Sequence, residues 1–301
     1  MENRRLSRRS SELLLAGVII ARATSYLFSK ISMTGLGIFN LLALRFLLAF
    51  ALLAVLFCRR LRRIDRRSLW AGVIMGGMYF LVMTAELSGL KRTTSSHVSF
   101  LENTAIVLVP LLGALVYRRA PGVKAVVCAA LTLAGVGFLT LGGDVRFGLG
   151  EAFSMLAALL YAGAILVTDR LTHKGHVDVL AAGIVQVVTL GLLSLAASCV
   201  FETPRLPQGG TEWLSVLALA VVCSGFGFTL QPVAQAGTTA ERAGMFCALN
   251  PLVAAVLGVV FRHEQLGLQS LIGAALILAG ILHSYAKLPE GGICKHRKQF
   301  T

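Results

Sequence analysis

The chain contains one stretch twice, and this stretch decides the fold: Cys128-Ala-Ala-Leu-Thr-Leu-Ala-Gly135 and Gly273-Ala-Ala-Leu-Ile-Leu-Ala-Gly280, 145 residues apart. The same offset aligns Leu112-Gly113 with Leu257-Gly258 and Tyr117-Arg118 with Phe261-Arg262. Strings of Ala, Leu and Gly recur by chance in membrane proteins. One offset that holds across two adjacent segments and the loop between them favours an internal repeat instead. The sequence therefore predicts two related halves, residues 1–145 and residues 146–301.

Composition indicates that the solvent of this chain is lipid. Of its 301 residues, 56% are hydrophobic and 14% are charged, and the mean hydropathy is +0.78. Soluble domains carry nearer a quarter of charged residues, so the polar surface is too small to coat a water-soluble particle. The net charge of +14 lies in short runs between apolar segments, which argues against a nucleic-acid partner. The six cysteines form no C-x-x-C pair, and we expect no metal site and no cofactor.

Ten apolar windows are long enough to cross a bilayer as helices. We expect the first to be an uncleaved helix rather than a signal peptide. The predicted spans are 12–31, 37–57, 69–90, 96–117, 124–142, 149–168, 178–200, 212–234, 243–261 and 267–287.

Lysine and arginine residues orient these spans, because cytoplasmic loops carry the excess of positive charge. With the amino terminus inside, twenty of these residues fall on the cytoplasmic side and six on the other. Both termini are therefore placed in the cytoplasm, and the protein in the cytoplasmic (inner) membrane as a multi-pass protein. Because five helices is an odd number, the second half enters the membrane upside down relative to the first. Such inverted repeats occur in many secondary transporters.

Several motifs together carry a resemblance to a known family. They are Ala43-Leu44-Arg45-Phe46-Leu47-Leu48-Ala49, Asn250-Pro251-Leu252 followed by Phe261-Arg262-His263-Glu264, and the glycine-containing stretch Gly273 to Gly280. Their order and spacing resemble the drug/metabolite transporter superfamily, in its ten-helix EamA-type branch. The tryptophan-glycine pair common in that family's first helix is missing, and Arg119 stands where the second repeat has Glu264. The resemblance implies a transporter of small metabolites, often outward, with a midplane cavity between helices 1, 3, 4, 6, 8 and 9.

Ionisable residues inside spans are costly and point to function. Here they are Arg22, Arg45, Glu86 and Glu102. The opposite charges could neutralise one another as packing pairs, and we favour this structural role for Arg45. Arg22, Glu86 and Glu102 are candidates for the cavity as well as for packing. Either glutamate is also a candidate for coupling transport to protons.

Polar stripes and prolines extend the candidate site. Arg22 and Tyr26 share one stripe of the first helix, Ser99, Glu102 and Asn103 neighbour one another on the fourth, and Gln231 and Gln235 lie on the eighth. Pro110 and Pro251 lie in equivalent helices and are expected to bend them. Interrupted helices at matching positions of two repeats point to a transporter's central site. Asn250, beside Pro251, is therefore a candidate solute contact; the alternative is a packing kink.

The sequence thus predicts a secondary transporter that exports a small, amino-acid-like solute by alternating access, as a monomer or homodimer in the bilayer. The alternatives are a membrane channel and a membrane-embedded enzyme. His173 and Asp178 superficially match an acyltransferase pair, but they sit on a tight connection with no partner domain. We therefore expect no enzymatic activity.

Overall fold

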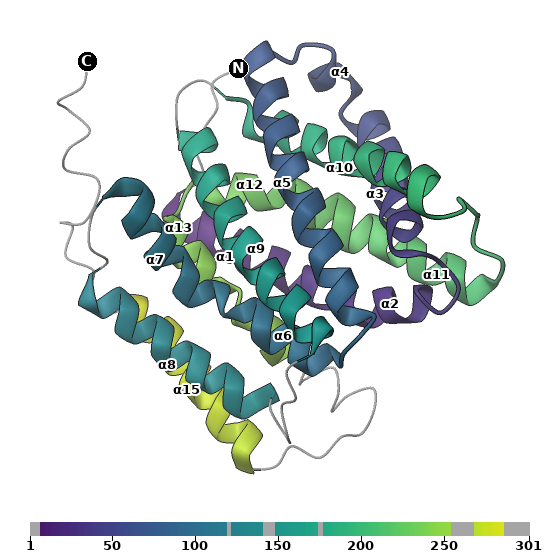
Figure 1. Ribbon diagram of the computed structural model, residues 1–301. Helices are drawn as coiled ribbons and strands as arrows, with labels where there is room; N and C mark the ends of the chain where they lie inside the picture. The colour runs from purple at the N-terminus through teal and green to yellow at the C-terminus, as the bar shows by residue number, and fades with distance from the viewer. Residues whose placement is uncertain (1–6, 119–121, 141–147, 174–176, 254–267, 286–301) are drawn as a thin grey trace.

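The computed structural model describes residues 7–118, 122–140, 148–173, 177–253 and 268–285, and all regular structure in these ranges is helical (Figure 1). The helices are α1 (Arg8–Ala23), α2 (Ser25–Ser32), α3 (Ile38–Leu56), α4 (Cys58–Leu61), α5 (Arg66–Leu90), α6 (Ser95–Asn103), α7 (Ala105–Tyr117), α8 (Val123–Thr140), α9 (Leu149–His173), α10 (Val179–Phe201), α11 (Gly210–Ala218), η1 (Leu219–Phe228), α12 (Thr229–Gln235), α13 (Ala240–Phe246) and α15 (Leu268–Tyr285).

Seven helical stretches in the described ranges are long and apolar enough to cross a membrane. They are Arg8–Ser32, Ile38–Leu56, Arg66–Leu90, His97–Val116, Leu149–His173, Val179–Phe201 and Gly210–Gln235. Shorter apolar stretches, Val126–Phe138 and Leu271–Gly280, lie in α8 and α15. The predicted span 243–261 runs partly outside the described residues. The all-helical, multi-pass architecture is confirmed, and the count of ten spans stays a prediction.

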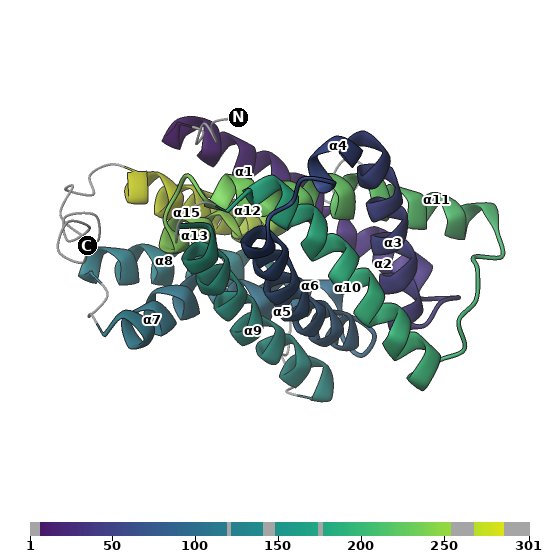
Figure 2. The same ribbon diagram turned by 90° about the horizontal axis from the view of Figure 1, so that it is seen from above.

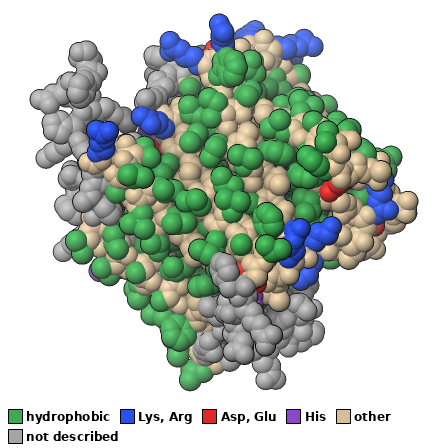
Figure 3. Space-filling model, in the orientation of Figure 1, with side chains coloured by type: hydrophobic (Ala, Val, Ile, Leu, Met, Phe, Trp, Pro, Cys, Tyr) green, Lys and Arg blue, Asp and Glu red, His purple; other side chains and the backbone are tan. Residues whose placement is uncertain are grey.

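The outer surface of the bundle is apolar. Hydrophobic side chains spread over the middle of the molecule, and Lys and Arg side chains gather at its edges, most densely along the top edge (Figure 3). Leucine, isoleucine and phenylalanine side chains that a soluble protein would bury are exposed here, among them Leu115, Phe201 and Leu278. Such a surface needs lipid around it.

Two predicted spans are broken at a threonine. α1 ends and α2 begins at Thr24, and α6 ends and α7 begins at Thr104. At each break the threonine hydroxyl donates a hydrogen bond to the carbonyl three residues earlier, 2.8 Å to Ala21 and 2.6 Å to Leu101. A side chain that takes a backbone carbonyl competes with the helical ladder, which accounts for both breaks.

The prolines behave differently from each other. α7 runs through Pro110 without interruption, so the predicted bend of this span lies earlier, at Thr104. In the other half, α13 ends at Phe246, and turn residues Cys247 and Ala248 follow, one turn before Pro251. A proline ring crowds the carbonyl one turn earlier, which explains this second break. Under the 145-residue offset the two interruptions nearly coincide.

The two copies of the repeated stretch pack against each other. A Cβ atom built on Gly135 would lie 2.8 Å from both the Gly273 carbonyl oxygen and the Ile277 nitrogen, and one built on Gly280 would lie 2.1 Å from the Thr132 hydroxyl and 3.2 Å from the Cys128 carbonyl. Adding 145 to a residue number in the first copy gives its counterpart in the second copy, and the contacts of Gly135 and of Gly280 are counterparts in this sense. α8 and α15 are therefore related by a local two-fold axis. The helices run antiparallel, since the start of each copy meets the end of the other. Both views place this pair side by side at one end of the molecule (Figures 1 and 2).

A second equivalent pair, α3 and α10, packs in the same antiparallel way near the opposite end. Glu202, which follows α10, accepts hydrogen bonds from the first backbone N–H groups of α3, 3.3 Å from Phe39 and 2.9 Å from Asn40. Asp178, which begins α10, forms two hydrogen bonds of 2.7 and 2.8 Å with Arg60, just past the end of α3. Carboxylates at helix amino termini satisfy the unpaired N–H groups there. The inverted relation between the halves is therefore visible in both helix pairs.

Candidate functional site

Arg22 lies at the centre of a polar network that joins both halves. Its Nη1 donates to the Gln231 amide oxygen at 2.5 Å and to the Tyr161 hydroxyl at 3.1 Å. Gln231 in turn donates to the hydroxyl of Tyr79 at 2.7 Å and, more weakly, to that of Tyr161 at 3.3 Å. The guanidinium carbon of Arg22 is 4.3 Å from the centre of the Phe228 ring, a cation–π contact. The network draws on α1, α5, α9, η1 and α12.

Two local features of the chain make room for Arg22. Helix η1 is wound as a π-helix of ten residues, a rare form that is frequent at functional sites. Within it stands Gly227, where an added Cβ would lie 2.8 Å from Cγ of Arg22. A side chain at this position would push the arginine stem away. A glycine is therefore needed for Arg22 to lie against η1.

A small cavity opens beside this network. Its walls come from α1, α2, α5, α6, η1 and the segment after α13, and its lining residues are Arg22, Ser25, Tyr26, Met83, Glu86, Glu102, Phe228 and Asn250. The free volume of about 10 Å³ holds roughly one water molecule. Five residues that the sequence singled out, Arg22, Tyr26, Glu86, Glu102 and Asn250, thus meet at one place.

The two carboxyl groups of the cavity differ in their partners. Glu102 accepts a short hydrogen bond from the hydroxyl of Tyr26. Glu86 has 4% of its surface exposed, and its Oε2 has no hydrogen-bond partner among the described residues. Neither carboxyl group lies within 4.0 Å of Arg22 or Arg45 in this part of the chain, so the direct ion pairs considered from the sequence are not formed. The charged side chains therefore line the same cavity without forming direct ion pairs.

Arg45 lies outside the cavity and holds helices together. It is fully buried, and its Nε donates to Ser224 at 3.0 Å while its Nη1 donates to Ser25 at 3.3 Å. Its partners are hydroxyl groups of η1 and α2 rather than a carboxylate. This geometry suits the packing role expected for Arg45, with a different kind of partner.

The remaining candidates in the described part of the chain do not line the cavity. Asn103 donates to the Ser99 carbonyl at 2.6 Å, within the same helix. Gln235 is buried one helical turn beyond Gln231, and its amide oxygen has no partner among the described residues. His173 is 3.2 Å from Asp169, and Asp178 pairs with Arg60, so His173 and Asp178 do not form a pair. The motif residues Arg119, Phe261, Arg262, His263 and Glu264 lie outside the described residues.

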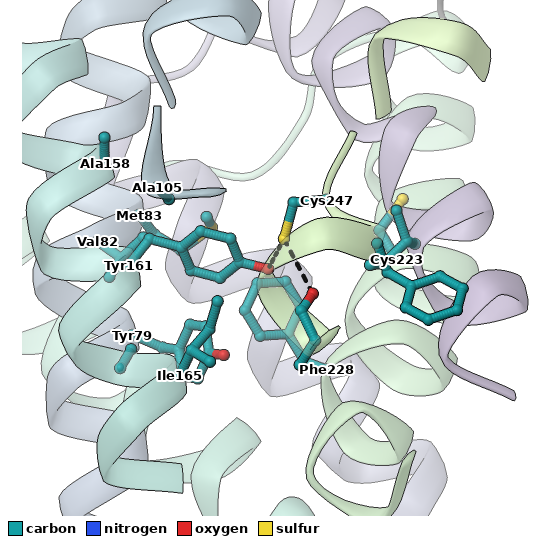
Figure 4. Close-up of a cluster of buried hydrophobic side chains, with 14 of the residues drawn as sticks. Tyr79, Val82, Met83, Ala105, Ala158, Tyr161, Ile165, Cys223, Phe228 and Cys247 are labelled. Carbon is teal, nitrogen blue, oxygen red and sulfur yellow. Dashed lines mark hydrogen bonds between the residues drawn. The ribbon is translucent and has the colours of Figure 1, made fainter. Parts of the chain in front are cut away.

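Sequence reasoning missed three side chains of the network, Tyr79, Tyr161 and Cys247. The Tyr161 hydroxyl points at the Cys247 thiol, which donates to it at 3.5 Å, with Tyr79 and Phe228 close by (Figure 4). Tyrosines of membrane proteins gather at the water interface. A tyrosine in the middle of an apolar helix therefore needs a buried partner, and this signal was available for Tyr79 and Tyr161.

Polar contacts join the two halves at both ends of the bundle. At the end where α1 begins, Arg242 of α13 forms a buried ion pair of 2.7 Å with Glu12. At the other end, Glu151 of α9 accepts a hydrogen bond of 2.5 Å from Thr93 and lies 3.4 Å from His97. The first contact joins the two halves on one side of the cavity, and the second joins them on the other.

An apolar helical bundle with a polar, charged centre enclosed between two halves defines a multi-pass membrane protein of the transporter class. The comparisons with known proteins agree. Residues 9–141 and 148–286 each match the EamA-like transporter family, and the chain belongs to that family. The cytoplasmic (inner) membrane is the location consistent with it.

Individual relatives extend this result. An uncharacterized transporter of Archaeoglobus fulgidus is 27% identical over 92% of this chain and 98% of its own length. Another from the same organism is 31% identical over 78% of this chain and 83% of its own. A protein of known crystal structure, 21% identical, superposes with a TM-score of 0.78 over 93% of this chain and 99% of that one. At this identity the likeness establishes the fold alone.

Proposed function

We propose that the protein is a secondary transporter that moves a small, amino-acid-like solute outward by alternating access around the cavity of Arg22, Glu86 and Glu102. The observation that carries this proposal is the convergence of charged residues from α1, α5 and α6 on one buried space bounded also by the second half. Buried charges in membrane proteins are expensive and are retained at substrate and ion pathways.

The charges of the cavity suit a solute that carries both signs. Of the guanidinium donors of Arg22, only Nη1 is engaged by the described residues, and an arginine presents five N–H donors in all. The remaining donors are available to a carboxylate. Glu86 and Glu102 offer acceptors to an ammonium group, and the Asn250 amide oxygen, without a partner among the described residues, offers another. Alpha-amino acids and related metabolites combine these groups.

The size of the cavity supports alternating access. A pocket with room for about one water cannot hold a metabolite, whereas ligand pockets span roughly 300–1,000 Å³. Solute binding therefore requires the halves to separate on one side. The Glu12–Arg242 pair and the Thr93–Glu151 contact lie on opposite sides of the cavity and would open in turn.

Proton coupling belongs to the same proposal. Glu86 has no charge partner in contact, and an isolated buried charge is costly. The ionised Glu86 is therefore best tolerated when a cationic group of the solute occupies the cavity. When the cavity is empty, protonation of Glu86 removes the unpaired charge. We further propose ten spans with both termini in the cytoplasm, repeats over residues 1–145 and 146–301, and a monomer or homodimer as the unit.

Purified full-length protein in liposomes tests the function. A panel of amino acids and related metabolites, with and without a pH gradient, should show saturable uptake and counterflow of at least one solute. Absence of flux across the panel, with folding confirmed by size-exclusion chromatography, contradicts the proposal. Flux that neither saturates nor shows counterflow indicates a channel, and chemical conversion of a solute indicates an enzyme.

The proton hypothesis has its own pair of variants. Replacing Glu86 with glutamine should abolish accumulation driven by the pH gradient while solute exchange continues. Glu212→Gln is the matched control, because Glu212 accepts a hydrogen bond from the Gln208 backbone outside the cavity. Accumulation that persists in Glu86→Gln and Glu102→Gln refutes coupling through these residues.

A further inference from the structure

A second, larger groove lies away from the central cavity, where α5 begins and α9 ends. It is open to the surroundings, has a volume of about 610 Å³, and is lined by Arg66, Arg67, Trp70, Ala71, Ile74, Leu171 and Val177. Two arginines stand at its mouth, and the other lining side chains are apolar or aromatic. None of these residues contributes to the network around Arg22.

The two arginines are free to bind an anion. Their guanidinium groups make no hydrogen bond or ion pair within the described residues, and both side chains are exposed. The acids that neighbour them are already engaged. Asp65 accepts hydrogen bonds from the backbone of Arg67 and Ser68 and caps α5, and Asp178 binds Arg60. The mouth of the groove therefore keeps two unneutralised positive charges.

The wall of the groove continues into the lipid-facing surface. Trp70 is 55% exposed and Ile74 is 45% exposed, on the face of α5 that looks away from the bundle. Tryptophan is enriched at the boundary between headgroups and hydrocarbon. Lys and Arg side chains gather along the top edge of Figure 3, above the apolar surface, and Figure 1 shows in the same orientation that α4 and the start of α5 lie at this edge. The groove thus presents charge at headgroup depth and apolar side chains below it.

The charge bias of the loops puts this end of the bundle on the cytoplasmic side, where anionic lipids face the protein. The segment from residue 59 to residue 67 contains six arginines and one acid. Most of these arginines help to orient the protein in the membrane, whatever the direction of their side chains. Arg66 and Arg67 differ from the other four because they line this groove.

We propose that this groove binds an anionic phospholipid of the cytoplasmic leaflet, with its phosphate on Arg66 and Arg67 and an acyl chain along Trp70 and Ile74. Arginine suits the phosphate because its planar fork donates two parallel hydrogen bonds. Zwitterionic phospholipid carries a compensating positive headgroup and is bound less tightly.

Native mass spectrometry of the full-length protein in neutral detergent tests the proposal. Detergent removes the charged bilayer surface, so only site-bound lipid is retained. We expect phosphatidylglycerol to be retained in preference to phosphatidylcholine, and the double variant Arg66→Gln/Arg67→Gln to weaken its binding about thirtyfold. The matched control is Arg62→Gln/Arg63→Gln, which removes the same charge from the same loop outside the groove. It should stay within about threefold of the parent.

Two results overturn the proposal. Equal weakening in the two double variants means that lipid is held by diffuse surface charge. Displacement of the bound lipid by millimolar inorganic phosphate or glycerol phosphate means that the arginines bind a free anion and the apolar wall contributes nothing. Because Arg66 and Arg67 are exposed, their substitution leaves the core intact, and an unchanged thermal unfolding midpoint in the absence of lipid confirms this.

Discussion

Gly76 and Gly77 are adjacent in α5, and we predict that alanine destabilises the protein at Gly76 and not at Gly77. At Gly76 the added Cβ would lie 2.6 Å from Cβ of Thr189 and 2.8 Å from the Gln186 carbonyl oxygen, both on α10. At Gly77 nothing lies within 4 Å of it. Inside membranes, small residues allow close helix packing, and dispersion contacts depend on that approach.

The structure sets the expected magnitude. Relieving the overlap at Gly76 forces α5 and α10 apart, and overpacking of this kind costs about 1–3 kcal/mol. At either position alanine stabilises the helix by up to about 1 kcal/mol relative to glycine, because its helix propensity is higher. With the full gain from helix propensity, the expected outcome is a net loss of up to about 2 kcal/mol for Gly76→Ala and a change between zero and a gain of about 1 kcal/mol for Gly77→Ala.

Thermal unfolding of the full-length protein in detergent, followed by circular dichroism, measures the difference. The midpoint should fall for Gly76→Ala and hold or rise for Gly77→Ala. Gly72→Ala should behave like Gly76→Ala, because its added Cβ would lie 2.5 Å from Cβ of Val185 on the same face of α5. Equal midpoints for the Gly76 and Gly77 variants would refute the close packing of α5 on α10.

Three further predictions follow from the contacts described. Tyr26→Phe removes the hydroxyl that donates to Glu102 and should lower the initial transport rate in liposomes at least about tenfold, because a hydrogen bond to a charged group contributes about 1.5–3 kcal/mol. An unchanged rate would show that this hydrogen bond plays no part in transport. Asp65→Ala should lower the free energy of unfolding by about 1 kcal/mol, while Asp65→Asn, which preserves an N-cap, should lose much less. The hydrogen bond from the Ser68 side chain, with those from the backbone of Ser68 and Arg67, lowers the pKa of Asp65. The stability that Asp65 contributes is therefore present above its ordinary pKa and is lost as the pH falls through the lowered value. A stability difference between the parent protein and Asp65→Ala that does not shrink in acid contradicts this prediction. Gly135→Ala should destabilise more than Gly280→Ala, because the first meets backbone atoms of α15 and the second chiefly the Thr132 hydroxyl, which can rotate; the double variant should cost less than the two losses added, since the first substitution already parts the helices.

Several properties of this protein were determined by the sequence alone. Hydropathy over windows of about twenty residues shows which segments lie in lipid. The multi-pass helical architecture could therefore be predicted without knowledge of the tertiary contacts. The 145-residue offset identified the two copies that pack as α8 and α15. Charges inside apolar helices identified Arg22, Glu86 and Glu102, because an ionisable group within the membrane is costly and such residues are therefore rare outside functional or packing sites.

Which of these residues meet was decided only by the tertiary structure. Arg22 and Arg45 look alike in the sequence, yet one lines the cavity and the other binds the hydroxyls of Ser224 and Ser25. The reason is that the two helices pack against different neighbours: Arg22 donates to side chains of α9 and α12, and Arg45 to side chains of α2 and η1. The helical period of one segment cannot predict which side chains of other helices it will meet. Tyr79 and Tyr161 reach the network for the same reason, since the partners of a buried side chain come from helices distant in the sequence.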